Sequence, residues 1–393
     1  MRADAVAALT VAIVALPLSM AIAIASGVGP ERGLYAAIIG GFLISLLGGS
    51  RFQIGGPAGA FITLVASTVA AQGIDGLMLV SVMAGALMLL AGLCGLGRFV
   101  RLIPHPVVHG FTAGIAVIIF TSQLHDLFGL HLPAGEPAAF LPKLQALWQA
   151  AHSWQLAAAS LSAMTIIGIV LLRRYAPGIP ALLLVVTLAA VLAVFLKLPV
   201  ETIGTRFGGI PHGLPHPAMP AASWQRALHL LPLATGFALL GAIESLLSAV
   251  VADGMTGRQH RSNSELMAQG LANICTAFFG GLCVTGTIAR TATNVRAGAR
   301  TPVAGMLHAV LVLLFMMVAA PLVSYVPLAA LAGVLVTVAW NMLDTSALAK
   351  LLRAARGDVL VLLVTLLVTL AHDLVLGIIA GTLLASALRF LRR

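Results

Sequence analysis

The sequence has 393 residues, of which 60% are hydrophobic and only 9% are charged, whereas charged residues make up roughly a quarter of a soluble globular protein. Most of the surface must therefore face lipid, which excludes a soluble globular protein and indicates a polytopic membrane protein. A net charge of +10 would suggest nucleic-acid binding in a soluble protein. Here the basic residues lie in short gaps between apolar runs, where they orient the chain in the bilayer.

Apolar runs follow one another along almost the entire chain. A spanning helix needs about 20 apolar residues. By this length criterion we predict fourteen segments, two of them too short or too polar to span alone. In chain order the segments cover residues 5–28, 33–48, 57–71, 77–96, 106–124, 154–172, 179–196, 229–252, 264–284, 288–298, 302–320, 327–343, 358–371 and 373–388. The first run has no small-residue cleavage site, so we interpret it as a retained helix rather than a signal peptide.

The loops indicate an orientation and a division into halves. With the N-terminus inside and the segments alternating, most of the 22 lysines and arginines fall on the inner side, so both termini are expected to be cytoplasmic. The proline-rich stretch 199–228 is the longest polar connection and is expected outside. It separates residues 1–198 from residues 229–393, with seven segments in each half. An odd number per half inverts the second half relative to the first, as in inverted-repeat transporters.

Two interrupted segments occupy the third place in each half. The first is broken at Gly55, Gly56 and Pro57, and the second at Gly280, Gly281 and Gly286, before a short Thr-rich helix. Irregular backbone at membrane depth is tolerated only where protein buries it or water reaches it, so both breaks should line a cavity. If two half-helices meet there by their N-termini, their free amides favour an anion. The alternative is that these glycines only allow tight helix packing.

Charges inside the predicted spans are few. Glu244 lies in the middle of the eighth segment, whereas we place the other acidic residues, Glu265 among them, at span ends or in loops. An unpaired carboxylate at that depth costs at least about 2.5 kcal/mol, so Glu244 must be protonated, paired or facing water. Arg290 lies one turn into the second half-helix. It can pair with Glu244 or hold an oxyanion by bidentate hydrogen bonds, and a purely structural ion pair is the alternative.

Two further polar residues lie near these charges in the sequence. Ser248 follows Glu244 by four residues and shares its helix face, so it can add a ligand, although a hydrogen bond back to its own helix is the more common role. His308 is alone on an apolar span and is expected to be a packed core histidine. The three cysteines have no paired spacing, and we expect neither disulfides, a metal site nor a cofactor.

Several motifs together resemble the sulfate permease (SulP) family of anion transporters and exchangers, and the resemblance covers essentially the whole chain. The most specific stretch is Pro30-Glu-Arg-Gly-Leu-Tyr-Ala-Ala37 followed by Gly48-Gly-Ser-Arg51, with Arg32 as a minor departure. The other similar segments are Leu16-Pro-Leu-Ser-Met-Ala21, Ile54-Gly-Gly-Pro-Ala-Gly59, Ile103-Pro-His-Pro-Val-Val-His-Gly-Phe111, Ile243-Glu-Ser-Leu-Leu247, Ala252-Asp-Gly-Met-Thr256 and the Arg290 segment.

The resemblance implies an all-α membrane protein of fourteen segments in two inverted repeats, divided into core and gate subdomains, with half-helices at segments 3 and 10. It also implies a small-anion site between those half-helices. Carried over residue by residue, the substrate-binding positions are Leu18, Ser19, Ile22, Pro57, Ala58, Gly59, Ala60, Phe61, Ala289, Arg290 and Thr291, with Glu244 and Ser248 as the coupling positions.

Some relatives bind sodium through an aspartate at the position of Glu244 and have a small hydroxyl residue at that of Arg290. Here the fixed positive charge would repel sodium, so we expect coupling to a proton or to no cation. Homodimers are usual in the family. Its members usually continue into a soluble cytoplasmic STAS domain, and because this sequence stops at Arg393 we expect no soluble domain within it.

We therefore expect a secondary active transporter of small anions in a bacterial cytoplasmic membrane. Proton-coupled symport of a carboxylate, a dicarboxylate or an inorganic oxyanion such as sulfate or bicarbonate is the first hypothesis. The alternatives are an uncoupled exchanger or channel on the same scaffold, or a nucleobase permease. An enzyme is not expected, because no nucleophile–base pair or metal cluster lies within any predicted span.

Overall fold

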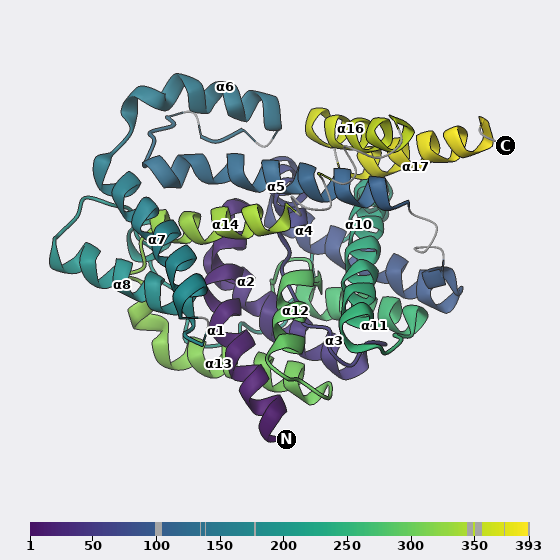
Figure 1. Ribbon diagram of the computed structural model, residues 1–393, viewed down its shortest axis with the longest axis horizontal. Coiled ribbons are helices and arrows are strands. Elements are labelled where there is room, and N and C mark those ends of the chain that lie inside the picture. The colour runs from purple at the N-terminus through teal and green to yellow at the C-terminus, as the bar shows by residue number, and fades with distance from the viewer. Residues whose placement is uncertain are drawn as a thin grey trace.

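The chain folds into a helical bundle, shown in Figure 1 as a computed structural model. The structure describes residues 1–98, 104–133, 135–137, 139–176, 178–343, 349, 356–372 and 374–391. Within these residues, seven helical stretches are at least 18 residues long and apolar enough to cross a membrane. The prediction of an all-helical membrane protein is confirmed.

The first half contains most of its predicted segments as regular helices. Segment 2 is built from three consecutive pieces, and its central piece is a π-helical turn, a feature often found at functional sites. The elements are α1 (Arg2–Ala25), α2 (Pro30–Tyr35), η1 (Ala36–Gly40), α3 (Gly41–Leu47), β1 (Gly55–Gly56), η2 (Gly59–Phe61), α4 (Ile62–Leu93), α5 (His105–Phe128), α6 (Phe140–Ala150), η4 (Ala151–Ser153), α7 (Leu156–Tyr175) and α8 (Ala181–Phe195).

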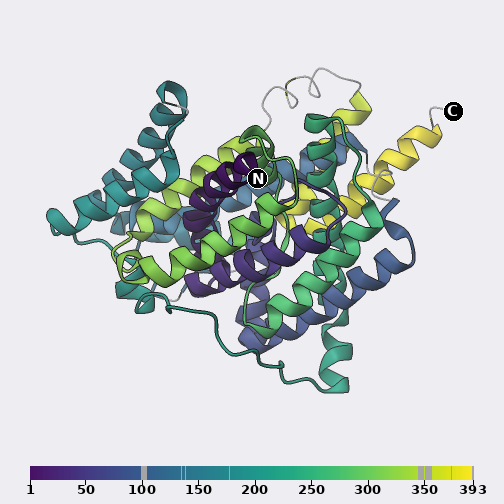
Figure 2. The same ribbon diagram turned by 90° about the horizontal axis from the view of Figure 1, so that it is seen from below.

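The second half follows a short helix and an extended connection. The short helix is α9 (Ile203–Phe207). The elements that follow are α10 (Trp224–Thr256), α11 (Ser262–Phe278), β2 (Thr285–Gly286), α12 (Ile288–Arg296), α13 (Val303–Val323), α14 (Leu328–Met342), α16 (Arg356–Ala371) and α17 (Leu374–Leu391). Figure 2 shows the extended chain between α9 and α10 crossing the molecule along one edge. The backbone N–H of Ala218 donates to the carbonyl of Phe278 (2.7 Å) and fixes this connection against the end of α11.

Several boundaries differ from the prediction. Segments 3 and 4 form one helical stretch, α4, whose break is confined to Gly73, which has a φ of 68°. Only glycine adopts this left-handed conformation readily, so the kink occurs there. The helices α6 and α9 were not predicted, because both lie in connections that lack a long apolar run. Helix α11 ends at Phe278, and the extended chain leading to β2 replaces its predicted last turn.

The helices pack in two groups, which confirms the expected core and gate subdomains. In the core, α4 packs on α10 and α11, and α1 and α3 pack on α13. In the gate, α5 packs on α14 and α16, α7 packs on α8 and α14, and α16 packs on α17. Helix α1 also contacts α8 and α14, so it joins the two groups. Figure 1 shows α5 and α14 running nearly parallel across the upper part of the view.

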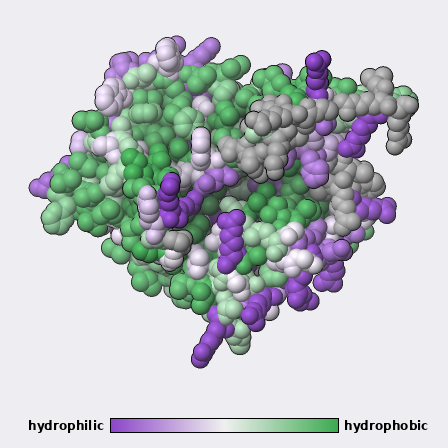
Figure 3. All heavy atoms as spheres, viewed as in Figure 1, coloured by the Kyte–Doolittle hydropathy of each residue, from purple (hydrophilic) through white to green (hydrophobic). Residues whose placement is uncertain are grey.

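Large apolar side chains remain exposed on the outside of the bundle. They include Val318, Leu322 and Leu367, and hydrophobic surface covers large areas of the face shown in Figure 3. In water such areas would drive association, whereas in a bilayer they match the acyl chains. The outer surface therefore agrees with a chain that is surrounded by lipid.

Helices α4 and α11 approach each other through a pair of glycines. A Cβ added at Gly85 would lie 2.5 Å from the carbonyl oxygen of Gly270, and a Cβ added at Gly270 would lie 2.5 Å from that of Gly85. These atoms belong to backbone, which cannot rotate away. The two helices can therefore keep this separation only if both positions lack a side chain.

We predict that Gly85→Ala lowers the melting temperature of the purified protein, because α4 and α11 must move apart at a cost of about 1–3 kcal/mol. Gly236→Ala in α10 is the control, since its nearest contact would be an ordinary one of 3.5 Å to the Val375 side chain. A thermal unfolding curve in detergent measures both. Equal melting temperatures for Gly85→Ala and the wild type would contradict this account of the packing.

Candidate anion site

The two interrupted segments meet directly. Strands β1 and β2 pair antiparallel, with Gly55 opposite Gly286 and Gly56 opposite Thr285. Next to them, Ile54 accepts a hydrogen bond from the Thr287 N–H (2.9 Å) and donates its own N–H to the Thr291 hydroxyl (3.1 Å). The two broken segments therefore meet at Gly55, Gly56 and Gly286, whereas Gly280 and Gly281 lie earlier, between α11 and β2. We call this meeting point the crossing, defined by residues 54–57 and 285–287.

A short helical element begins directly after each strand. On one side Pro57 leads into η2 and α4, and on the other Thr287 is the residue before α12. The first amides of a helix have no partner within the helix, so both N-termini bring partial positive charge to the crossing. The charge comes from backbone, which explains how a site for anions can exist in such an apolar sequence.

Arg290 places a full positive charge beside the crossing. Its side chain is completely buried, and Nη2 donates to the Ser19 hydroxyl (3.1 Å) and, at 3.4 Å, to the Pro57 carbonyl. Its Nε and Nη1 atoms are buried without a hydrogen-bond partner in the described part of the chain. A guanidinium carries five N–H donors, so most of its hydrogen-bonding capacity is unused. The structure brings Ser19, Pro57 and Arg290 together, as the sequence predicted.

The remaining predicted substrate-binding residues differ in burial. Leu18 and Ile22 are buried on α1, Ala58, Ala60 and Phe61 are buried at the start of segment 3, and the Phe61 ring packs on Phe237 at 5.5 Å. Gly59 is half-buried. On α12 the two neighbours of Arg290 differ, because Thr291 is fully buried whereas Ala289 is exposed. Ala289 is thus the accessible side of this short helix.

The coupling positions differ from the expectation in their contacts. The Ser248 hydroxyl donates to the Thr291 hydroxyl (3.1 Å), so it joins α10 to α12 and does not bond back to its own helix. Glu244 is half-buried, and its Oε2 atom is buried without a hydrogen-bond partner among the described residues. Neither Glu244 nor Arg290 occurs in an ion pair within 4.0 Å in that part of the chain. The Glu244–Arg290 pair, one of the arrangements considered, is therefore not formed.

Glu265 lies at a span end, as predicted, but the sequence did not indicate that its side chain is buried. Its carboxylate is fully buried in the first turn of α11 and accepts four hydrogen bonds. The donors are the backbone N–H groups of Gly49 (2.8 Å) and Ser50 (3.1 Å) and the side-chain amides of Gln53 (2.9 Å) and Gln269 (2.8 Å). The sequence signal was a polar stripe at four-residue spacing, Glu265, Gln269 and Asn273, on one face of an apolar span.

Glu265 and Asn273 of this stripe, together with Gln53, fix the backbone on either side of the crossing. The Gln53 amide, one residue before Ile54, donates both to Glu265 and to the Ser245 carbonyl (3.0 Å), next to Glu244. The Asn273 side chain accepts the N–H of Val284 (2.9 Å) and donates to its carbonyl (2.8 Å), immediately before β2. Both strands are therefore positioned by buried amide side chains.

A hydrogen-bonded chain of Asp253, His260 and Ser262 joins the last turn of α10, the loop and the first residue of α11. The His260 ring is 2.6 Å from the Asp253 carboxylate and 3.0 Å from the Ser262 hydroxyl. The same carboxylate also accepts the backbone N–H of His260 (3.1 Å). This additional backbone contact closes the loop, and we interpret the chain as structural.

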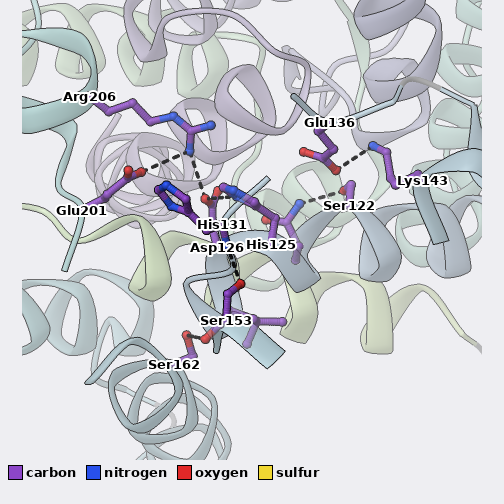
Figure 4. Close-up of polar contacts among 12 residues, drawn as sticks. Ser122, His125, Asp126, His131, Glu136, Lys143, Ser153, Ser162, Glu201 and Arg206 are labelled. Atoms are coloured by element: carbon purple, nitrogen blue, oxygen red, sulfur yellow. Dashed lines mark hydrogen bonds and ion pairs between the residues drawn. The ribbon is translucent and has the colours of Figure 1, made fainter. Parts of the chain in front are cut away.

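A second polar cluster lies among the gate helices and the connecting segment (Figure 4). Asp126 is bound by the His125 ring (2.8 Å) and by Arg206 of α9 (3.0 Å), and Arg206 also lies 3.7 Å from Glu201. A cavity of about 50 Å³ lies beside this cluster, lined in part by His131, Gln155 and Leu328. It shares no residue with the predicted anion site. The cluster fastens the connecting segment to the gate.

The fold is that of a multi-pass membrane protein built on a bundle with two broken segments, and the comparisons place it among anion transporters. The chain belongs to the sulfate permease family, whose model matches residues 1–365. It is 42% identical over 391 residues to YvdB of Bacillus subtilis, a protein named for sulfate transport, covering 99% of this chain and 73% of that one. It is 31% identical over 396 residues to the bicarbonate transporter BicA of Picosynechococcus, covering 98% and 70%.

Solved structures agree with this assignment. The transmembrane domain of a cyanobacterial bicarbonate transporter, BicA, matches with a TM-score of 0.84 and 30% identity, covering 98% of this chain and 97% of that chain. The murine anion transporter Solute Carrier 26 family member A9 matches with a TM-score of 0.89 at 18% identity, covering 100% of this chain and 69% of that one, which shows the shared fold. These relatives are named as transporters and not as enzymes.

We predict that Glu265→Gln lowers both the melting temperature and transport. A glutamine side chain has one accepting oxygen, and its NH2 group would face N–H donors that now lack an acceptor. Each buried donor left unpaired lowers the free energy of unfolding by about 1–3 kcal/mol. Glu201→Gln, at an exposed side chain in a loose ion pair, is the matched control. A thermal unfolding curve and an uptake assay measure the two effects. Wild-type behaviour of Glu265→Gln would show that the network does not hold the crossing.

Proposed function

We propose that this protein is a proton-coupled symporter of a small anion, either a carboxylate or dicarboxylate or an inorganic oxyanion such as sulfate or bicarbonate. One observation carries the proposal. The Arg290 guanidinium is completely buried at the crossing, yet two of its three nitrogens have no partner in the described residues. A buried charge without a counter-charge is costly, and a bound anion would remove that cost.

The surrounding chemistry favours an oxyanion. Arginine presents parallel N–H groups that match carboxylate and oxyanion geometry, and two helix N-termini add partial positive charge from the backbone. Relatives named for sulfate and bicarbonate support the inorganic members of this class. Substrate-binding roles are proposed for Leu18, Ser19 and Ile22 of α1, for residues 57–61, and for residues 289–291.

Two carboxyl groups near the crossing, that of the buried Glu265 and that of the half-buried Glu244, suggest where a proton is carried. Glu265 receives four hydrogen bonds, which stabilise a carboxylate, whereas the buried Oε2 of Glu244 receives none from the described residues. An ionised Glu244 would therefore be an unpaired charge at membrane depth. We assign the transported proton to Glu244, with Ser248 as the hydroxyl that ties its helix to α12.

The absence of a Glu244–Arg290 pair changes the expected coupling. Glu244 does not have to release Arg290 before an anion binds. Instead, an anion at the crossing adds a second negative charge near Glu244 and so disfavours its ionised form. Anion binding and protonation of Glu244 then strengthen each other by the same factor, as linkage requires. Anion and proton would cross the membrane together.

We predict that Arg290→Ala weakens anion binding at least about tenfold, because a hydrogen bond to a charged group contributes about 1.5–3 kcal/mol. Arg296→Ala is the control, since Arg296 is exposed at the last turn of the same helix. The measurement is competition of labelled substrate uptake by sulfate, bicarbonate, a dicarboxylate, chloride and uracil in proteoliposomes. Unchanged affinity and selectivity in Arg290→Ala would remove this residue from the site, and competition by uracil would favour a nucleobase permease.

We predict that Glu244→Gln retains anion exchange but loses accumulation driven by an inward proton gradient, because glutamine imitates the protonated form. Wild-type uptake should accelerate as the external pH falls. Both are measured in proteoliposomes that contain a pH-sensitive dye, with Glu201→Gln as the control. Accumulation at wild-type levels by Glu244→Gln, together with proton entry, would place the proton elsewhere. Non-saturating flux in the wild type would instead favour a channel.

A further inference from the structure

Arg290 fits into the crossing only because a particular side chain is missing. A Cβ added at Gly56 would overlap with Nη1 of Arg290 and would lie 3.3 Å from its Cζ atom. Gly56 is also the β1 residue paired with Thr285, so its backbone position is fixed by the ladder. Neither the strand nor the guanidinium can move aside without breaking hydrogen bonds.

The guanidinium is enclosed on its other sides as well. Nη2 is held by the Ser19 hydroxyl of α1 and by the Pro57 carbonyl. Behind Gly56, the Cα atom of Ala37 in the π-helical turn η1 would lie 3.7 Å from an added Cβ. The side chain is fully buried, so the atoms around it limit where the guanidinium can move. A methyl group at position 56 would therefore compete with the guanidinium for one space.

We propose that Gly56 is a positioning residue whose missing side chain makes the space for the Arg290 guanidinium. The two residues form a matched pair, in which the size of residue 56 decides whether a fixed positive charge can lie against β1. A larger residue at position 56 would require a smaller, uncharged residue at position 290, and the site would then depend on its helix N-termini or on a bound cation to hold an anion. This inference deepens the proposed function and rests on it for the role of the charge.

The neighbouring glycines show that this requirement is local. A Cβ at Gly55 would meet the Ile44 side chain, and a Cβ at Gly59 would meet only the end of the Ile119 side chain. Flexible apolar side chains can adjust, whereas the Arg290 guanidinium is held by two hydrogen bonds. Gly59→Ala, in the same segment, is therefore the control for added bulk. Gly56 also has a φ of 159°, which strains an added side chain by itself, and the Arg290→Ser background separates this backbone contribution from the overlap with Arg290.

The test is a double-mutant cycle with Gly56→Ala, Arg290→Ser and the combined variant. Melting temperatures are measured on the purified full chain in detergent. We expect Gly56→Ala to lower the melting temperature by several degrees in the Arg290 background, and by less than half as much in the Arg290→Ser background. Gly59→Ala should cause the same small change in both. An equal loss from Gly56→Ala in both backgrounds would overturn the proposal, because the glycine would then be needed by the backbone alone.

Binding of sodium sulfate and sodium bicarbonate is the second readout. Gly56→Ala and Arg290→Ser should each weaken binding at least about tenfold, and the combined variant should be no weaker than either. If Arg290→Ser leaves both affinities unchanged, the anion-binding role of Arg290 fails, while the melting temperatures still decide whether the two residues share one space.

Gly56→Ala alone can also fail to yield folded protein. Recovery of folded protein on adding Arg290→Ser would then support the pair, and failure of the combined variant as well would overturn it.

Discussion

The structure depends on one constraint, which is that a chain broken inside a membrane must find hydrogen-bond partners for its backbone within the protein. The two broken segments satisfy this requirement by pairing with each other. Ile54 uses its N–H on the Thr291 hydroxyl and its carbonyl on the Thr287 N–H, and the glycines on either side complete the ladder. Each break alone would be unstable, so the two segments fix each other's position and bring two helix N-termini together.

The buried charges follow from that arrangement. Arg290 lies against the paired strands with donors to spare, and Glu265 is satisfied by neutral N–H groups rather than by a cation. Because the positive charge is not cancelled by either buried glutamate, an anion does not have to displace an internal partner. A transporter must bind its substrate reversibly, and a site whose charge is held by weak neutral contacts suits that need better than a closed ion pair.

The core and the gate are each held together by their own contacts. Glycines bring α4 and α11 into backbone contact in the core, which keeps the crossing and its supporting amides in one unit. The gate helices carry their own polar fastening, in which Asp126 connects α5 to Arg206 of the connecting segment. Helix α1 contacts both groups and contributes Ser19 to the Arg290 contacts. It is therefore one element through which a movement of one group would reach the site, and the contact of α5 with η2 is another.

By itself the sequence determined the lipid environment and the existence of two breaks, because an apolar composition indicates burial in lipid and clustered glycine and proline disfavour a continuous helix. Single prolines did not have this effect, since Pro17 and Pro232 lie inside the helices α1 and α10. The sequence also identified Arg290, Ser19 and Pro57 as neighbours, through the family's motifs. Only the tertiary structure decided which groups pair. Glu244 and Arg290 lie in predicted segments 8 and 10 but do not form an ion pair. The Ser248 hydroxyl bonds to Thr291, and the Glu265 side chain is buried although it lies in the first turn of a helix. These outcomes depend on how far apart helices lie and which faces they present, and such distances are set by packing between residues hundreds of positions apart.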